Sequence, residues 1–173
     1  MRIAITGGAG CLGSNLIEHW LPAGHEILVL DNFAAGKREV VPDVPGLTVR
    51  EGSITDKDFV EAEFASFKPE VVIHAAAAYK DPDDWAEDAA TNVLGSIHTA
   101  RAAEACGAAR IVNFQTALCY GRPDALPIPA DHRTAPFTSY GISKTAGEAF
   151  MHMSSVPTLS LRIANVTGPR LAI

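Results

Sequence analysis

The sequence contains little cysteine and no cluster of basic residues. Its three cysteines, Cys11, Cys106 and Cys119, are far apart and form no CxxC pair, which excludes a disulfide framework and favours a reduced, cytoplasmic protein. Lysine and arginine number 14 against 20 aspartates and glutamates, so the formal net charge is −6 and no nucleic-acid partner is expected. No two histidines lie four residues apart on one predicted helix, so we expect no metal site.

Long apolar runs are also absent. None approaches the ~18–20 residues of a membrane-spanning helix, so we expect no membrane association. A strand-like segment follows Met1 directly, which predicts that there is no signal peptide. With 173 residues, of which 47% are apolar and 20% charged, the composition is that of one folded domain over residues 1–173.

Short β-branched runs alternate with segments that carry apolar residues at helical spacing. Strands are predicted at 2–6, 26–31, 47–53, 71–77, 110–116 and 158–165. Helices are predicted at 11–24, 55–67, 83–107 and 139–155, with a proline-rich loop at 121–136. Asp84 and Glu87 are spaced as a capping box for the third helix. This alternation predicts an α/β fold with a doubly wound parallel sheet of about six strands.

Glycines are concentrated between the first strand and the first helix. Gly7, Gly10 and Gly13 form a GxxGxxG pattern, which permits a tight turn, a close approach of a pyrophosphate and close packing of helix on strand. The helix N-terminus then offers free N–H groups to an anion. Asp31 ends the second strand, where a carboxylate can bind ribose hydroxyls and repel a 2′-phosphate. The pattern therefore favours NAD over NADP, and the alternative is a glycine turn beside a surface aspartate.

A second motif, SYGISK, places Tyr140 and Lys144 four residues apart on a predicted helix. An ammonium group beside a phenol stabilises the phenolate, so Lys144 is expected to draw the pKa of Tyr140 towards neutrality. Such a tyrosine can exchange a proton with a substrate hydroxyl. The alternative is an ordinary exposed pair of helical side chains. His74 is interpreted as a packed histidine and Lys80 as a solvated lysine.

Seven features occur together in this order: TGGAGCLGS, Asp31, HAAA, Asn92, Thr116, the Tyr140–Lys144 pair and NVTGPR. Over essentially the whole chain they resemble the extended branch of the short-chain dehydrogenase/reductases, the nucleotide-sugar epimerases and dehydratases. The resemblance implies a Rossmann-like domain that binds NAD and a nucleotide-sugar substrate. It also implies a set of cofactor-binding residues: Gly7, Gly10, Cys11, Leu12, Gly13, Asp31, Asn32, Ser53, Ile54, Ala75, Ala76, Ala77, Tyr140 and Lys144.

Catalytic roles are implied by the same resemblance. Tyr140 would be the acid/base and Thr116 would hydrogen-bond the reacting oxygen of the substrate. Lys144 would hold the nicotinamide ribose and lower the pKa of Tyr140. Asn92 would organise the site, and Asn165 would lie near the phosphates of the sugar nucleotide.

The sequence departs from the family pattern at two places. Ser53 stands where relatives usually have aspartate beside the adenine, which puts that contact in question. Ala117 and Leu118 follow Thr116 where the 4,6-dehydratases carry Asp-Glu. Without that acid/base pair we favour an epimerase, which oxidises a sugar hydroxyl and returns hydride to the other face. A nucleotide-sugar dehydratase or a reductase is a lesser alternative.

Members of the extended branch have a further C-terminal portion that grips the nucleotide sugar. This chain stops at Ile173, so that substrate domain is expected to be largely absent, whether the chain is a fragment or naturally short. A truncated or non-catalytic NAD-binding domain is therefore the main alternative to an epimerase. The family also implies a homodimer that packs through helices 83–107 and 139–155.

Overall fold

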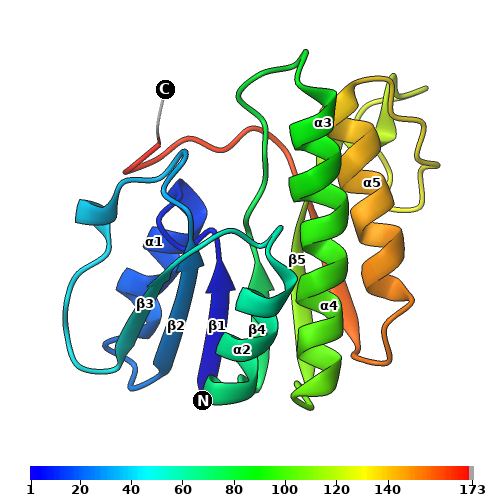
Figure 1. Ribbon diagram of the computed structural model, residues 1–173. Helices are drawn as coiled ribbons and strands as arrows, with labels where there is room; N and C mark the ends of the chain where they lie inside the picture. Colours follow the sequence, from blue (N-terminus) through cyan, green and yellow to red (C-terminus); the bar gives the residue numbers. More distant parts are fainter. Residues whose placement is uncertain (172–173) are drawn as a thin grey trace.

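A computed structural model describes residues 1–171 as a six-stranded parallel sheet flanked by helices (Figure 1). The strands are β1 (Arg2–Thr6), β2 (Glu26–Asp31), β3 (Leu47–Glu51), β4 (Val71–His74), β5 (Arg110–Thr116) and β6 (Thr158–Ile163). Their order in the sheet is β3-β2-β1-β4-β5-β6. Every pairing is parallel, so the predicted doubly wound topology is confirmed. The order reverses between β1 and β4, the position at which such sheets bind ligands.

Helices cover both faces of this sheet (Figure 1). They are α1 (Cys11–Trp20), α2 (Lys57–Phe67), α3 (Trp85–Asp88), α4 (Gly95–Ala105) and α5 (Ser139–His152). Successive side chains of a strand point to opposite faces of the sheet, and those of β1 pack in two separate hydrophobic cores. Ala4 of β1 packs in the core that contains Phe64 of α2, whereas Ile3 and Ile5 pack with Ile17 of α1. The central strands β1, β2 and β4 are buried at nearly every position after their first residue, because helices cover both faces of the sheet there.

The long helix predicted at 83–107 has a break in its hydrogen-bonding pattern. Between α3 and α4 lies η2 (Ala89–Leu94), a π-helical segment that contains Asn92. There the carbonyl of Asn92 accepts a 2.7 Å bond from Ser96 Oγ and lies so close to α5 that a Cβ on Gly147 would overlap it. Asp84 caps α3 as predicted, through Glu87 N at 3.0 Å, but the Glu87 carboxylate binds Thr91 instead of closing the box.

Several predicted boundaries were wrong by a few residues. Three strands end earlier than expected, at Glu51, His74 and Ile163, because the chain leaves the sheet there to form loops. Short 3-10 turns, η1 (Arg38–Val40) and η3 (Ala117–Tyr120), lie in segments where no helix was expected. Of the helices in residues 1–171, none combines the length and apolarity needed to cross a bilayer. Within the same residues, no cluster of side chains suits a metal ion.

Candidate functional site

A cleft of about 530 Å³ opens at the carboxyl ends of β1, β2 and β4. Its walls come from the glycine turn, the ends of β2 and β3, the segment after β4 and the start of α5. Most of the residues predicted to bind a cofactor lie on these walls: Gly7, Gly10, Cys11, Leu12, Gly13, Asp31, Asn32, Ser53, Ile54, Ala75, Ala76, Ala77 and Tyr140. The structure therefore brings together residues that are up to about 130 positions apart in the sequence.

The glycine turn leaves no room for side chains. Gly7 has a φ of +71°, and a Cβ there would lie 2.6 Å from Ala76 N. A Cβ on Gly13 would lie 2.6 Å from Gly8 Cα. Gly10 is the N-cap of α1, which has no side-chain cap and no acidic residue in its first turn. The backbone N–H groups and the positive end of the helix dipole are thus left to an anion in the cleft.

Asp31 fixes the turn to the end of β2. Its Oδ2 accepts a hydrogen bond from Ala9 N and its Oδ1 accepts one from Phe33 N, both at 2.8 Å. The side chain is 8% exposed and lies on the wall of the cleft. Each carboxylate oxygen keeps a free lone pair, so both can still accept bonds from the hydroxyls of a ribose.

The hydroxyl of Ser53 makes its hydrogen bonds within its own loop. Its Oγ lies 2.8 Å from Thr55 Oγ1 and accepts a bond from Thr55 N at 3.2 Å. The side chain nevertheless lines the cleft beside Ile54. A serine here offers a neutral surface in place of the carboxylate that the family pattern would supply.

Asn92 joins two parts of the site. Its Oδ1 accepts a bond from Ala78 N at 2.9 Å, and its Nδ2 donates to Ala78 O and to Ser143 Oγ, each at 3.0 Å. It thereby ties the segment after β4 to α5, close to Tyr140 and Lys144. Asn92 itself lies behind the wall of the cleft rather than on it, and its predicted organising role stays a prediction.

Tyr140 reaches the cleft, whereas Lys144 is buried behind it. Burial, together with the negative charge of Asp88 and the neighbouring Tyr79, raises the pKa of Tyr140 to about 12. Lys144 is 3% exposed, and burial lowers its pKa to about 8 against the opposing pull of Glu148. Contrary to the expectation that Lys144 draws the pKa of Tyr140 towards neutrality, that pKa is raised in this structure, and burial of the phenolate is the largest cause.

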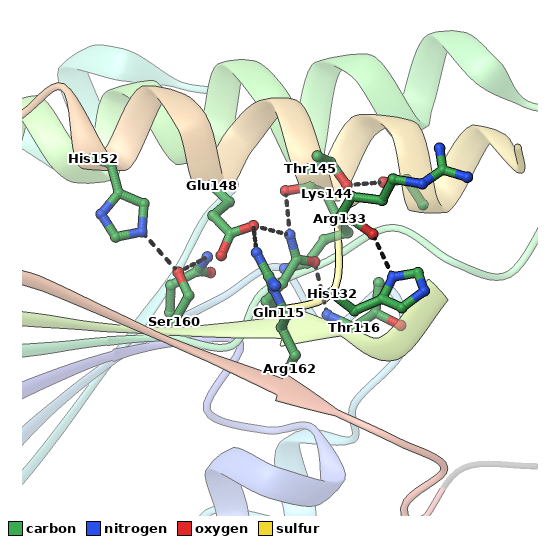
Figure 2. Close-up of polar contacts among 12 residues, drawn as sticks. Gln115, Thr116, His132, Arg133, Lys144, Thr145, Glu148, His152, Ser160 and Arg162 are labelled. Carbon is green, nitrogen blue, oxygen red and sulfur yellow. Dashed lines mark hydrogen bonds and ion pairs between the residues drawn. The ribbon is translucent and has the colours of Figure 1, made fainter. Parts of the chain in front are cut away.

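A polar network holds α5 against the sheet below Lys144 (Figure 2). Gln115 Nε2 donates to Lys144 O and to Glu148 Oε2, both at 3.0 Å, and Gln115 Oε1 accepts a bond from Thr116 N at 2.7 Å. Arg162 Nη2 lies 3.6 Å from Glu148 Oε2. Sequence reasoning missed Gln115, since a single glutamine in a strand carries no signal of its partners.

Besides Asn92 and Lys144, two further predicted site residues are not on the walls of the cleft described by residues 1–171. Thr116 ends β5, where its Oγ1 accepts a bond from Leu118 N at 3.2 Å and caps η3. Asn165 is exposed in the segment after β6. Their contacts with the reacting oxygen and with the substrate phosphates stay predictions.

Other wall residues were not found from the sequence. Lys80 is exposed, as expected of a solvated lysine, but its Nζ also donates to Ala34 O at 2.6 Å and links the loops after β4 and β2 across the cleft. Arg170, also on the wall, donates to Ser14 Oγ, Asn15 Oδ1 and Glu18 Oε2 and holds the last segment on α1. These contacts join residues far apart in the sequence, so the local sequence pattern does not predict them.

Known proteins share the sequence pattern of this chain over nearly its whole length. Residues 3–172 match the sequence model of the NAD dependent epimerase/dehydratase family. The UDP-glucose 4-epimerase of Mycolicibacterium smegmatis is 33% identical over 182 residues, which cover 98% of this chain and 58% of that protein.

Solved structures extend the likeness. The Bordetella bronchiseptica enzyme WbmG in complex with NAD is 74% identical with a TM-score of 0.97, over 100% of this chain and 56% of that one. The UDP-glucose 4-epimerase of Thermotoga maritima with UDP-glucose is 31% identical with a TM-score of 0.90, over 98% of this chain and 57% of that one. The chain thus spans little more than half the length of these relatives.

Proposed function

Because the chain belongs to the NAD dependent epimerase/dehydratase family, we propose that it is the cofactor-binding part of an epimerase that acts on a nucleotide sugar. The observation that carries this proposal is the single cleft that gathers the glycine turn, Asp31, the alanine segment and Tyr140. WbmG, at 74% identity, has been solved with NAD and with NAD and UDP together. Relatives at lower identity are UDP-glucose 4-epimerases, which supports a UDP-sugar as substrate.

NAD fits the residues present. The uncapped first turn of α1 would receive the pyrophosphate, and the glycine turn can pack closely against the backbone of Ala76 because Gly7 carries no side chain. Asp31 would accept hydrogen bonds from the adenosine ribose hydroxyls and would disfavour a 2′-phosphate. The bound cofactor supplies a hydride acceptor, which the chain itself lacks.

Tyr140 is the general acid/base for the substrate in this proposal. In its phenolate form it would take the proton of the sugar hydroxyl as hydride leaves the carbon, and the resulting phenol would return that proton after the sugar has turned. A pKa of about 8 leaves Lys144 mostly charged at pH 7, and in this proposal its charge would favour the phenolate against the burial that raises the pKa of Tyr140. Ala117 and Leu118 form the turn after Thr116 and offer no acid or base there, which favours epimerisation over dehydration.

A homodimer through α4 and α5 belongs to the same proposal. Apolar side chains of these helices, Phe150 and Met153, are 42% and 76% exposed, beside a small groove that also includes Ile97. A second copy of the chain would bury them. A cytoplasmic location also stays a proposal, supported by the scattered cysteines.

Calorimetric titration with NAD and with NADP tests the cofactor site, after any co-purified nucleotide has been removed. We expect NAD to bind more tightly than NADP, and no binding of either to a folded chain would contradict the proposal. Turnover is then tested with UDP-sugars in the chain, in Tyr140→Phe and in Tyr120→Phe. Tyr120 is a matched control because it is buried away from the cleft, against Arg162 and His132.

Tyr140→Phe should bind NAD and lose turnover, whereas Tyr120→Phe should retain it. Normal turnover by Tyr140→Phe would refute the acid/base role. NAD binding without turnover in the unmodified chain would instead favour the second candidate, a non-catalytic NAD-binding domain. That candidate is supported by the position of Thr116 outside the walls of the cleft and by the raised pKa of Tyr140.

A further inference from the structure

Four buried polar side chains form one continuous chain of hydrogen bonds beneath the cleft. Thr6 at the end of β1, His74 at the end of β4, Ser96 in α4 and Asn92 in η2 are each at most 3% exposed. Thr6 Oγ1 lies 2.9 Å from His74 Nδ1, and His74 Nε2 lies 3.1 Å from Ser96 Oγ. Ser96 Oγ donates to Asn92 O at 2.7 Å. We call these four residues the histidine relay.

The direction of each bond in the histidine relay follows from its partners. A carbonyl oxygen only accepts, so the one hydroxyl hydrogen of Ser96 is committed to Asn92 O. Ser96 must therefore accept from His74, which places a hydrogen on Nε2. At the other end Thr6 Oγ1 accepts from Ala76 N at 3.4 Å and is free to donate its own hydrogen to a bare Nδ1.

A neutral ring suits this arrangement. Burial and the nearby positive charge of Lys144 lower the pKa of His74 well below its usual value. A second ring hydrogen, on Nδ1, would compete with the hydroxyl hydrogen of Thr6 and leave one of them without an acceptor. The relay is thus fully satisfied with one tautomer and with no charge.

Both ends of the histidine relay hold the same wall of the cleft. Thr6 binds Ala76 N, and the side chain of Asn92 binds both backbone groups of Ala78. Ala75 to Ala78 all line the cleft. Asn92 also reaches Ser143, the residue before Lys144. A change at His74 is therefore transmitted to the cofactor-facing backbone and to α5 without any direct contact.

We propose that His74 is a positioning residue, held as the neutral Nε2–H tautomer, whose two hydrogen bonds set the backbone of residues 75–78 against the cofactor. The part of this inference that concerns the cofactor rests on the proposed function. The tautomer and the anchoring of the backbone do not, because both are properties of the chain alone.

The tautomer of the His74 ring can be determined by nitrogen-15 NMR. His74→Gln identifies the signal among the six histidines, since its spectrum lacks that resonance. We expect a protonated Nε2 and a bare, hydrogen-bonded Nδ1 at neutral pH. A protonated Nδ1, or a doubly protonated ring, would overturn the assignment.

Positioning is tested with three threonine variants. Thr6→Val removes the hydroxyl from the relay, Thr6→Ser restores it, and Thr99→Val is the matched control. Thr99 is fully buried in α4 and its hydroxyl bonds only Gly95 O, at 2.8 Å, so its loss leaves the relay intact. Thr6→Val should speed amide exchange at Ala76 and weaken NAD binding by about 2- to 10-fold each. Thr6→Ser and Thr99→Val should change neither.

Equal effects of Thr6→Val and Thr99→Val on exchange and on NAD affinity would overturn the positioning role, since general loss of packing would then explain both. If the unmodified chain binds no NAD, the proposed function fails. The tautomer and the exchange at Ala76 then still decide whether the histidine relay holds the backbone.

Discussion

Replacement of Gly7 by alanine tests how closely the glycine turn approaches the segment after β4. Gly7 has a φ of +71°, and the added Cβ would lie 2.6 Å from Ala76 N, 2.7 Å from Ala76 Cα and 2.9 Å from Ala75 C. These are backbone atoms, so no side chain can rotate away and the segment itself must shift. A left-handed alanine costs about 1–2 kcal/mol. Overpacking adds about 1–3 kcal/mol.

Gly24→Ala separates the two costs. Gly24 has a φ of +82° but no heavy atom within 4 Å of the position of a Cβ. Alanine there should cost only the left-handed conformation, about 1–2 kcal/mol. The effect of alanine on the unfolded chain is the same in both variants and cancels in the comparison.

Urea unfolding followed by circular dichroism measures both variants at equal m-value. Gly7→Ala should lose about 1–3 kcal/mol more than Gly24→Ala in the free energy of unfolding. Because the displaced segment faces the cleft, Gly7→Ala should also lose NAD binding, whereas Gly24→Ala should keep it. Equal losses of stability, or unchanged NAD binding by Gly7→Ala, would refute the argument from close approach.

Two further variants test the charged groups of the site. Lys144→Met should stabilise the chain at pH 7 by on the order of 3 kcal/mol, since the pKa of Lys144 falls from 10.5 to about 8 on folding. The folded state binds fewer protons than the unfolded state between those values, so the unmodified chain should gain stability as pH rises from about 8 to 10.5 and Lys144→Met should not. Urea unfolding across that range measures this, and parallel pH profiles would contradict it. Asp31→Asn weakens the acceptors of Ala9 N and Phe33 N, and should lower NAD affinity at least about tenfold and reduce the preference over NADP. Calorimetry compares it with Asp43→Asn, an exposed control, and equal affinities would count against the role of Asp31.

Some parts of the site could be predicted because they depend on short stretches of chain. A tight turn between a strand and a helix demands small residues at fixed spacing, so Gly7, Gly10 and Gly13 mark this turn in the sequence alone. The spacing of Tyr140 and Lys144 likewise placed them on one helix. The pKa of Tyr140 could not be predicted in this way, because it depends on burial and on Asp88 from another helix.

The sequence by itself determined the alternation of strands and helices, the parallel sheet and the residues of the glycine turn. These follow from periodicity and from backbone geometry, which act over a few residues. Only the tertiary structure decided that Gln115 locks α5 beside Thr116, that Lys80 crosses the cleft, and that His74 links the glycine-turn strand to Asn92. The two ring bonds of His74 join residues that are 68 and 22 positions apart. Their hydrogen bonds are satisfied only when the packed sheet brings the partners within reach, so no local pattern of residues encodes them.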